Sequence, residues 1–297
     1  MSSINNIETI KNTELNELLD TFKKYQNMVN LEIEKYISSN FPTCIQPMIK
    51  YIVGGGKRLR SILTLLFGNI EDIMDNKMII DMAISIELIH CLSLVIDDTP
   101  SMDNDDYRRD RPSFHKRYGI TKTNLIIYYL LNKITLLFSK YDFKDTSLID
   151  IININLKHLL EGQCLDINLD QNEIINYDFK YYNEQNYLDS KNFKDEYQKI
   201  LDLLPDSFDS NKMGLFIKNV NLNFLKTSSL FCLSIISPVL INCNTAHENY
   251  ENIMNELKIW SNLFGLVFQY SDDILDIEQD KMSNNPNVTF IIGKQQT

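Results

Sequence analysis

Residues 79–96 read IIDMAISIELIHCLSLVI, and two aspartates, Asp97 and Asp98, follow directly. The apolar side chains of this stretch would cover every side of a helix instead of forming one stripe. Such a pattern is typical of a helix that other helices surround. We therefore predict a central helix over residues 79–96 that ends at an acidic cluster.

Helical periodicity extends over most of the chain on both sides of this central helix. Only 9 glycines and 7 prolines interrupt the 297 residues, and the apolar residues between them recur at helical spacing. One apolar stripe runs from Leu15 to Tyr36 and stops before Pro42. The other predicted helices cover about residues 122–140, 146–168, 213–241 and 248–280. This pattern predicts an all-α fold.

The segments between the predicted helices decide the domain organisation. None of the short connections is polar enough to mark a domain boundary, which favours a single domain over residues 1–297. Residues 170–212 differ from the rest because they are polar, rich in tyrosine and asparagine, and poorly periodic. We interpret residues 170–212 as a polar surface insertion within that domain.

Charge, cysteines and apolar runs limit the function classes. A formal net charge of -11 argues against a nucleic-acid partner, because no region concentrates enough lysine and arginine to neutralise a row of phosphates. The five cysteines are scattered and never spaced as Cys-x-x-Cys, which indicates reduced, buried thiols. The longest apolar run, residues 228–242, is shorter than the roughly 18 residues that span a bilayer. We therefore expect a cytoplasmic protein without a transmembrane segment.

A dense acidic cluster follows the central helix in the stretch DDTPSMDNDD, residues 97–106. Its carboxylates would repel one another unless cations lie between them, and oxygen-only ligands suit Mg²⁺ or Ca²⁺ better than Zn²⁺. A solvated acidic loop is the alternative interpretation. The carboxylates concerned are Asp97, Asp98, Asp103, Asp105 and Asp106.

A second acidic group lies on the last predicted helix. Its members are spaced i, i+3, i+4 and i+7 and share one helix face: Gln269, Asp272, Asp273 and Asp276. Carboxylates on such a face cost free energy unless they are paired, bound to metal or directed into a cavity. This second group favours a metal site over a structural role, and the two acidic faces could hold metal ions between them.

Cationic residues accompany both acidic groups. Clustered lysine and arginine side chains bind phosphate, and glycine lets the backbone approach it closely. GGGKRLR, residues 54–60, lacks the spacing of a Walker A loop. His90 lies two helical turns before Asp97 and points to the same side, although a lone histidine in an apolar helix is often a satisfied core residue. The cationic residues are Lys57, Arg58, Arg60, Arg108, Arg109 and Lys226, and the neutral Thr227 directly follows Lys226.

These motifs occur in a fixed order along the chain. They are GGGKRLR at 54–60, ELIHCLSLVIDDTPSMDNDDYRRDRPSFH at 87–115, EGQCLD at 161–166, Lys226-Thr227, and FQYSDDILD at 268–276. This order resembles that of the trans-isoprenyl (polyprenyl) diphosphate synthases, especially the geranylgeranyl diphosphate synthases of bacteria and plastids. The resemblance covers about residues 50–280 and implies a helical bundle of the isoprenoid synthase type with a central active-site cavity.

The resemblance also implies an activity. Members of this family condense isopentenyl diphosphate with an allylic diphosphate, which is dimethylallyl, geranyl or farnesyl diphosphate. Magnesium, about three ions per active site, and cationic side chains stabilise the departing pyrophosphate while an allylic carbocation forms. The expected assembly is a homodimer.

By resemblance, the residue roles fall into groups. The expected magnesium ligands are Asp97, Asp98, Asp103 and Asp272, supported by Asp273 and Asp276. The expected catalytic residues are Asp97, Asp103, Lys226 and Asp272. The isopentenyl diphosphate head group would lie at Lys57, Arg60, His90 and Arg109. The allylic diphosphate would lie at Arg108, Lys226, Thr227 and Gln269.

Product length in this family depends on the bulk of the residues just upstream of the first acidic motif. Leu92 and Ser93 occupy the fifth and fourth positions before Asp97, and neither is an aromatic plug. They therefore predict geranylgeranyl diphosphate as the product.

The chain departs from the family pattern at three places. Asp110 stands where a glycine is usual, residues 126–128 replace a run of a small residue, glycine and aspartate, and SNNPNVTF after the second acidic motif lacks the usual lysine. A non-catalytic or regulatory subunit of a prenyl synthase heteromer is an alternative, which degenerate metal motifs would support, although both motifs are intact here. A terpene cyclase is a further alternative, although cyclases seldom carry a GGKRLR-like segment or a second complete DDxxD motif.

Overall fold

The computed structural model describes residues 2–69, 76–138, 141, 146–167, 198–199, 202, 210–242, 249–283 and 287–294. The chain divides into two compact units, unit 1 at residues 1–142 and unit 2 at residues 143–297. The surface insertion predicted at 170–212 lies outside the described residues except at 198–199, 202 and 210–212. The insertion and the single domain both stay predictions.

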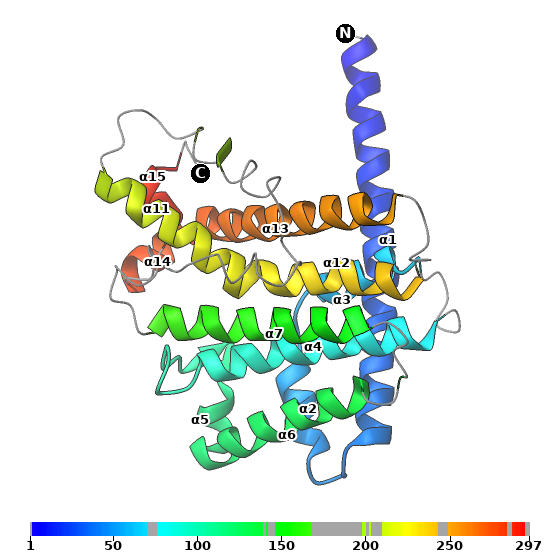
Figure 1. The fold of residues 1–297 in the computed structure, drawn as a ribbon, viewed down its shortest axis with the longest axis vertical. Helices are drawn as coiled ribbons and strands as arrows, with labels where there is room; N and C mark the ends of the chain where they lie inside the picture. Colours follow the sequence, from blue (N-terminus) through cyan, green and yellow to red (C-terminus); the bar gives the residue numbers. More distant parts are fainter. Residues whose placement is uncertain are drawn as a thin grey trace. The chain divides into compact units, whose positions relative to one another are not determined.

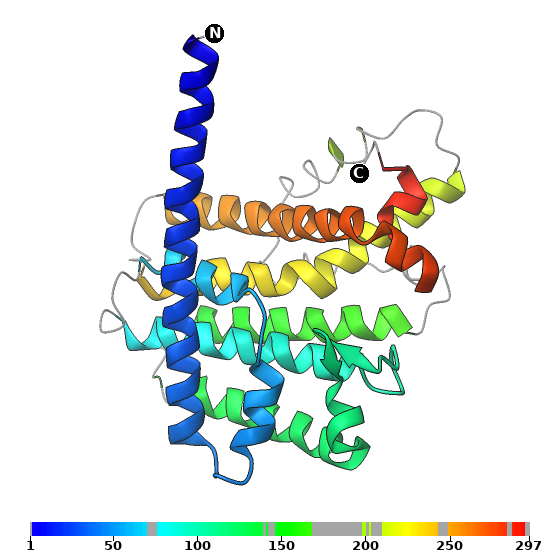
Figure 2. The ribbon, with the colours of Figure 1, turned by 180° about the vertical axis from the view of Figure 1, so that it is seen from behind.

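Unit 1 is built around the predicted central helix, which is α4 (Lys77–Asp97). The other elements of this unit are α1 (Ser2–Asn40), α2 (Gln46–Val53), α3 (Leu59–Phe67), β1 (Tyr107–Arg108), β2 (Arg111–Pro112), α5 (Phe114–Tyr118) and α6 (Ile120–Phe138). Helix α4 packs against α1, α2, α3 and α6 (Figure 1 and Figure 2). Its side chains are buried on all sides, which confirms the predicted central helix and the all-α class.

Helix α1 confirms the first predicted helix but buries only part of its apolar stripe. Val29, Ile33 and Ile37 are buried in unit 1. Leu15 and Leu18, by contrast, are 51% and 65% exposed. The stripe therefore contributes to the core of unit 1 through its second half.

Unit 2 contains long helices that lie side by side. Its elements are α7 (Thr146–Ile167), α11 (Ser210–Asn223), the π-helical turn η1 (Phe224–Ser228), α12 (Ser229–Asn242), α13 (Tyr250–Leu275), α14 (Ile277–Ser283) and α15 (Val288–Ile292). Helix α12 packs against α7 and α13, and η1 contacts α7, α11 and α13 (Figure 1). The helix predicted at 213–241 thus exists but widens at η1, and the helix predicted at 248–280 ends at Leu275.

Within the part of the chain that the structure describes, two helices are long and apolar enough to cross a membrane, judged by length and composition alone. They are Lys77–Asp97 and Lys212–Asn242. The second exceeds the apolar run at 228–242, because η1 joins α11 to α12 without a break. In each helix 78% of the apolar window is buried inside the protein, as is typical of core helices.

The cysteines correct one expectation. Cys91 and Cys232 are free and buried, as predicted, but Cys44 and Cys164 are free and exposed. Cys44 lies in the turn between α1 and α2, and Cys164 lies in the last turn of α7, where less of the chain covers a side chain. Cys243 lies outside the described residues.

Candidate functional site

Arg58 is buried, unlike Lys57 and Arg60, its two cationic neighbours in the sequence. It is the N-cap of α3 with a φ of 60°, and its side chain turns into the core of unit 1. Its guanidinium donates to Glu87 Oε1 at 2.7 Å and to the carbonyl oxygen of Val53 at 2.5 Å. Arg58 is therefore a partner in a buried ion pair, while Lys57 is exposed and Arg60 is half-buried.

His90 of α4 lies among the arginines of unit 1. Burial lowers the pKa of His90 well below its ordinary value, and the nearby arginines lower it further. Those arginines, in order of effect, are Arg60, Arg109, Arg58 and Arg108. The imidazole is therefore neutral near pH 7. Arg60 and Arg109, two residues predicted to hold one diphosphate together with His90, thus act electrostatically on its imidazole, and a bound anion would offset their charge.

A short hairpin presents the arginine pair that follows the first acidic motif. Strands β1 and β2 are antiparallel, and the turn residues Arg109 and Asp110 have φ values of 54° and 60°. Positive φ at both central residues suits the tight turn of a two-residue hairpin. The hairpin was not predicted, because two-residue strands leave no periodic pattern. Arg109 Nη1 donates to the carbonyl oxygen of Gly54 at 3.2 Å, which ties the turn to the glycine triplet.

Asp110→Gly is expected to stabilise unit 1 by about 0.5–1 kcal/mol, because glycine adopts a positive φ without the steric cost of a Cβ atom. Urea unfolding followed by circular dichroism measures the change. Asp20→Gly, within α1, is a control that should lower stability by roughly 1 kcal/mol. A loss of stability in Asp110→Gly would contradict this account of the departure from the family pattern.

The first acidic motif surrounds the end of α4. The backbone N–H of Asp103 donates to the carbonyl oxygen of Asp97 at 3.0 Å, so the two predicted ligands lie on one loop. Asp98 is buried against Arg108, whose Nε and Nη2 donate to Asp98 Oδ1 at 2.8 and 2.5 Å. Burial raises the pKa of Asp98, and the hydrogen bond from Arg108 opposes this shift. The role of Asp98 as a metal ligand stays a prediction.

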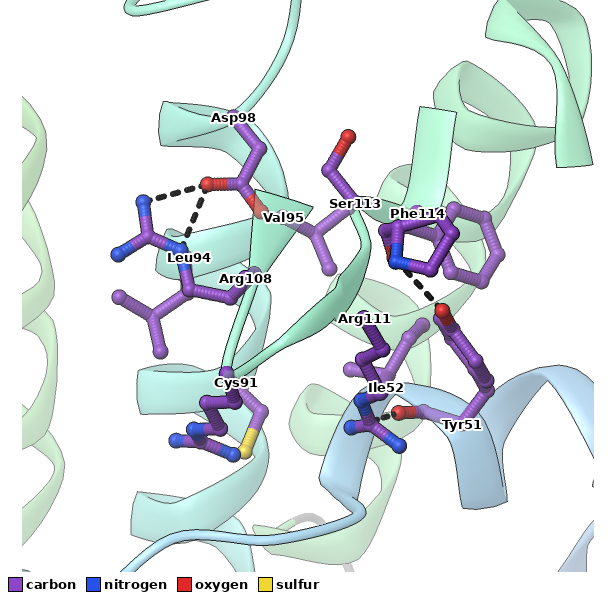
Figure 3. Close-up of a pocket in the computed structure, with 12 residues that line it drawn as sticks. Tyr51, Ile52, Cys91, Leu94, Val95, Asp98, Arg108, Arg111, Ser113 and Phe114 are labelled. Carbon is purple, nitrogen blue, oxygen red and sulfur yellow. Dashed lines mark hydrogen bonds and ion pairs between the residues drawn. The ribbon is translucent and has the colours of Figure 1, made fainter. Parts of the chain in front are cut away.

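A pocket lies between α2, α4 and the hairpin of unit 1 (Figure 3). Tyr51 donates its hydroxyl to the carbonyl oxygen of Pro112 at 2.6 Å, and Arg111 donates to the carbonyl oxygen of Tyr51 at 2.8 Å. These bonds fasten the hairpin to α2. Because Arg108, Arg109 and Arg111 line the pocket together with one carboxylate, Asp98, its charge suits an anion.

The π-helical turn η1 presents Lys226 and Thr227 in unit 2. Single π-helical turns inside α-helices occur frequently at functional sites. Lys226 Nζ lies 2.7 Å from Asp166 Oδ2 of α7, and Thr227 Oγ1 donates to Gln269 Oε1 of α13 at 3.1 Å. Three of the residues predicted around the allylic diphosphate, namely Lys226, Thr227 and Gln269, are thus neighbours. The fourth, Arg108, belongs to unit 1.

Two glycines let neighbouring helices approach η1. A Cβ on Gly162 of α7 would lie 2.9 Å from the backbone nitrogen of Lys226. A Cβ on Gly265 of α13 would lie 2.4 Å from Ser228 Oγ and 2.7 Å from Ser228 Cα. Any larger residue would push α7 or α13 away from η1 and displace Lys226 and Thr227.

The carboxylates of the second acidic motif differ in their surroundings. Asp273 is buried and accepts hydrogen bonds from the backbone N–H of Val288 at 2.8 Å and from Gln269 Nε2 at 3.0 Å. Burial raises the pKa of Asp273, and these two bonds oppose the shift. Asp272 is half-buried, and Asp276 is exposed at the C-cap of α13. The residues predicted to share one helix face thus range from buried Asp273 to exposed Asp276.

Two residues without a predicted role complete these contacts. Asp166, the partner of Lys226, is the last residue of EGQCLD, and that motif could have pointed to it. Asn287 is buried and donates to the carbonyl oxygen of Asp273 at 2.7 Å. The pattern Asn-Val-Thr before an apolar run is typical of a helix N-cap and could have pointed to Asn287.

The predicted metal ligands offer oxygen atoms only. Among the residues that the structure describes, no three histidine, cysteine, aspartate or glutamate side chains form a group that could hold a metal ion. Mg²⁺ needs few protein carboxylates, because it keeps several waters and binds substrate phosphates. Asp97, Asp103 and Asp272 therefore fit Mg²⁺ by the chemistry of their donors, and their assignment stays a prediction.

Acidification is expected to destabilise unit 2 through His158 of α7. Burial, helped by the charge of Lys157, lowers the pKa of His158 from 6.5 to about 4. The unfolded chain therefore binds this proton at a higher pH than the folded chain, so stability is lost as the pH falls below 6.5. The expected loss between pH 7 and pH 5 is about 2 kcal/mol in urea unfolding. His158→Gln should flatten this dependence, and an unchanged slope in that variant would contradict the assignment.

The family model described as polyprenyl synthetase matches residues 42–195, just over half of the chain. The matched range contains the glycine-rich cationic loop, the first acidic motif and EGQCLD. The second acidic motif lies beyond it.

Curated proteins and solved structures agree with this match. Geranylgeranyl pyrophosphate synthase 4 of Arabidopsis thaliana is 27% identical over 272 residues, which cover 86% of this chain and 60% of that protein. The heterodimeric geranylgeranyl pyrophosphate synthase large subunit 2 of the same plant is 40% identical over 92 residues, which cover 31% of this chain and 24% of that protein. The chain thus spans less than two thirds of these relatives.

Among solved structures, the geranyltransferase from Legionella pneumophila matches with a TM-score of 0.66 and 23% identity, covering 96% of this chain and 85% of that chain. At this identity the likeness shows the fold alone. It confirms the predicted isoprenoid synthase type of helical fold.

Proposed function

The chain belongs to the polyprenyl synthetase family, and we propose that it is a magnesium-dependent trans-prenyl diphosphate synthase. Its proposed substrates are isopentenyl diphosphate and an allylic diphosphate, which is dimethylallyl, geranyl or farnesyl diphosphate. The observation that carries this proposal is the pocket of unit 1 whose lining includes Arg108, Arg109 and Arg111. Three guanidinium groups beside one carboxylate, Asp98, give this pocket a charge that suits a small phosphorylated anion.

In unit 1, Lys57, Arg60, His90 and Arg109 are the proposed contacts of the isopentenyl diphosphate head group. The guanidinium groups supply charge, and the neutral imidazole of His90 can donate one hydrogen bond to a phosphate oxygen. Arg109 is already held by the carbonyl oxygen of Gly54, so less side-chain entropy is lost when the anion binds.

In unit 2, Lys226, Thr227 and Gln269 are the proposed contacts of the allylic diphosphate, together with Arg108 of unit 1. Asp166 orients the ammonium group of Lys226, and the hydrogen bond to Gln269 orients the hydroxyl of Thr227. The ammonium group of Lys226 has further N–H donors beyond the one that faces Asp166, and a donor oriented in this way would stabilise charge on the departing pyrophosphate without reorganising during the reaction.

Magnesium, about three ions, would add electrostatic stabilisation of the departing pyrophosphate. Its proposed ligands are Asp97, Asp98, Asp103 and Asp272. The buried carboxylate of Asp98 accepts two hydrogen bonds from Arg108, so it would reach a metal only by sharing its charge with that arginine. Asp103 is exposed to solvent, so a hydrated cation can reach its carboxylate.

Leu92→Phe is expected to shorten the product. We propose geranylgeranyl diphosphate for the wild type, because neither Leu92 nor Ser93 is an aromatic plug against a long prenyl tail. A phenyl ring at position 92 should raise the share of shorter products roughly tenfold, measured by sizing the extracted prenyl chains. Leu92→Met, which conserves volume, is the control. Leu92 is 2% exposed, so a thermal melt must accompany the assay, and a folded variant with an unchanged product distribution would contradict the prediction.

A second candidate function is that of a non-catalytic or regulatory subunit in a prenyl synthase heteromer. One matched relative is named as the large subunit of a heterodimeric synthase. The replaced run at 126–128 also supports this candidate, since local packing there differs from the family pattern. Both acidic motifs are complete, however, and this favours the catalytic proposal.

The decisive experiment incubates the purified chain with Mg²⁺, labelled isopentenyl diphosphate and each allylic primer in turn, and then sizes the products. Elongation of at least one primer supports the catalytic proposal. If a folded chain elongates none of the three primers, the catalytic proposal is overturned. Addition of the chain to an active synthase then tests the regulatory candidate.

We further propose a homodimer and a cytoplasmic location. The exposed apolar side chains of α6, which include Leu125 and Tyr128 at 66% and 72% exposure, support a subunit contact. Sedimentation velocity of the wild type and of Leu125→Glu tests the dimer.

The free thiols of Cys44 and Cys164 support a reducing compartment and hence the cytoplasmic location.

A further inference from the structure

The last turn of α13 is joined to α14 and α15 by buried polar contacts that the proposed mechanism does not use. We call these contacts the Asp273–Asn287 network, and its members are Gln269, Asp273, Asp280, Asn287 and Val288. Asp273 and Asn287 are 6% and 2% exposed. Because buried polar groups are costly to leave without partners, each member of such a network constrains the others.

Asn287 uses both N–H donors of its side-chain amide and both lone pairs of the amide oxygen. Nδ2 donates to the carbonyl oxygen of Asp273 at 2.7 Å and to Asp280 Oδ2 at 2.8 Å. Oδ1 accepts the backbone N–H of Thr289 at 2.9 Å, which caps α15, and the hydroxyl of Thr289 at 2.5 Å. One side chain therefore fixes α13, α14 and α15 to one another.

Asp273 extends this constraint to predicted substrate contacts. Its Oδ1 accepts from Gln269 Nε2 at 3.0 Å and its Oδ2 accepts from the N–H of Val288 at 2.8 Å. The other end of the same amide, Gln269 Oε1, accepts from Thr227 at 3.1 Å. Gln269 is thus bonded at both ends and held in one orientation. Asp272 directly precedes Asp273 on the same turn and is held with it.

Apolar packing fastens α15 to the same elements. Val288 is fully buried, and Ile292 lies one turn further along α15. Both belong to one cluster with residues of α11, η1 and α13, namely Phe216, Val220, Phe224 and Leu266. Because Phe224 opens the turn that carries Lys226 and Thr227, the docking of α15 stabilises η1 as well as the end of α13.

We propose that Asn287 and Asp273 are positioning residues that hold Gln269 and Asp272 in place for diphosphate and magnesium. This inference rests on the proposed function. Asp273 is 6% exposed and each of its oxygens accepts an N–H donor, which favours a role through its neighbours over direct contact with a metal. Changes to the partners that orient metal ligands typically alter metal affinity by about 10–100-fold.

The test compares Asn287→Ser with a matched control. Serine keeps an oxygen that can cap α15 but removes both Nδ2 donations. The control is Asn76→Ser, because Asn76 caps α4 of unit 1 through the same kind of bond, to the N–H of Met78 at 3.1 Å. Each protein is measured by hydrogen exchange without ligand and by calorimetric titration with Mg²⁺ and inorganic pyrophosphate.

In Asn287→Ser, we expect amides at 269–276 to exchange faster and the affinity for magnesium pyrophosphate to fall roughly tenfold. Asn76→Ser should leave both quantities unchanged. A purely structural role would reduce the fraction of protein that binds and leave the dissociation constant as it was, and this result would overturn the inference. Unchanged exchange at 269–276, or a wild type that does not bind magnesium pyrophosphate, would also overturn it. If the wild type binds magnesium pyrophosphate but elongates no primer, the proposed function fails while the positioning role is still decided by the two variants.

Discussion

Asp97→Asn is expected to lower the rate of condensation roughly a thousandfold, which corresponds to about 4 kcal/mol in the activation barrier. Asp97 ends α4 and is bonded through its carbonyl oxygen to the backbone N–H of Asp103. Asparagine keeps the shape and this backbone contact but removes the negative charge that a magnesium ion requires. The loss should therefore fall on chemistry and not on folding.

Steady-state turnover with saturating substrates measures this effect. Asp106→Asn is the matched control, because Asp106 lies in the same acidic stretch but pairs with Lys116 at 2.6 Å on the surface. That control should keep turnover within about twofold of the wild type. Retention of wild-type turnover by Asp97→Asn would remove Asp97 from the proposed ligands, and an equal loss in Asp106→Asn would mean that overall loop charge matters and not the metal.

Arg58→Met is expected to destabilise unit 1 by about 3–5 kcal/mol, because it leaves the carboxylate of Glu87 buried without its cation. The two side chains are 6% and 2% exposed, and their nitrogen and oxygen lie 2.7 Å apart. Arg58 also bonds Asn30 at 2.9 Å and the carbonyl oxygen of Val53 at 2.5 Å. Its loss should therefore loosen the glycine-rich loop against α1 and α4.

Urea unfolding measures the stability of this variant, and Lys57→Met is its neighbouring control. Lys57 is exposed, so its loss should change stability by less than about 0.5 kcal/mol while weakening binding of isopentenyl diphosphate. The double variant Arg58→Met with Glu87→Leu removes both charges and should recover most of the stability. A single variant as stable as the wild type, or a double variant no better than the single, would contradict the account of a buried ion pair.

The helices could be placed from the sequence because their pattern is local. Helices α4, α6 and α7 begin and end within a few residues of the ranges predicted at 79–96, 122–140 and 146–168. Helical spacing of apolar residues reflects contacts between each turn and the next, and these contacts join residues only three or four positions apart in the sequence. The order of the glycine-rich, acidic and cationic motifs was likewise sufficient to indicate the family that the comparisons confirmed.

Other features could not be predicted because they depend on pairing between side chains that are far apart in the sequence. Lys57, Arg58 and Arg60 look alike in the sequence, yet Arg58 turns inward to Glu87, 29 residues away. Lys226 meets Asp166 across 60 residues, and no periodicity records such a pairing.

The sequence by itself determined the all-α class, the central helix that ends at Asp97, and the order of motifs that indicated the family. The tertiary structure alone decided which of those charged residues are already engaged. It pairs Asp98 with Arg108, and it brings Asn287 and Val288 into hydrogen bonds with Asp273. The physical reason is that a buried charge persists only where a specific partner reaches it, and the partner's position is set by the packing of whole helices.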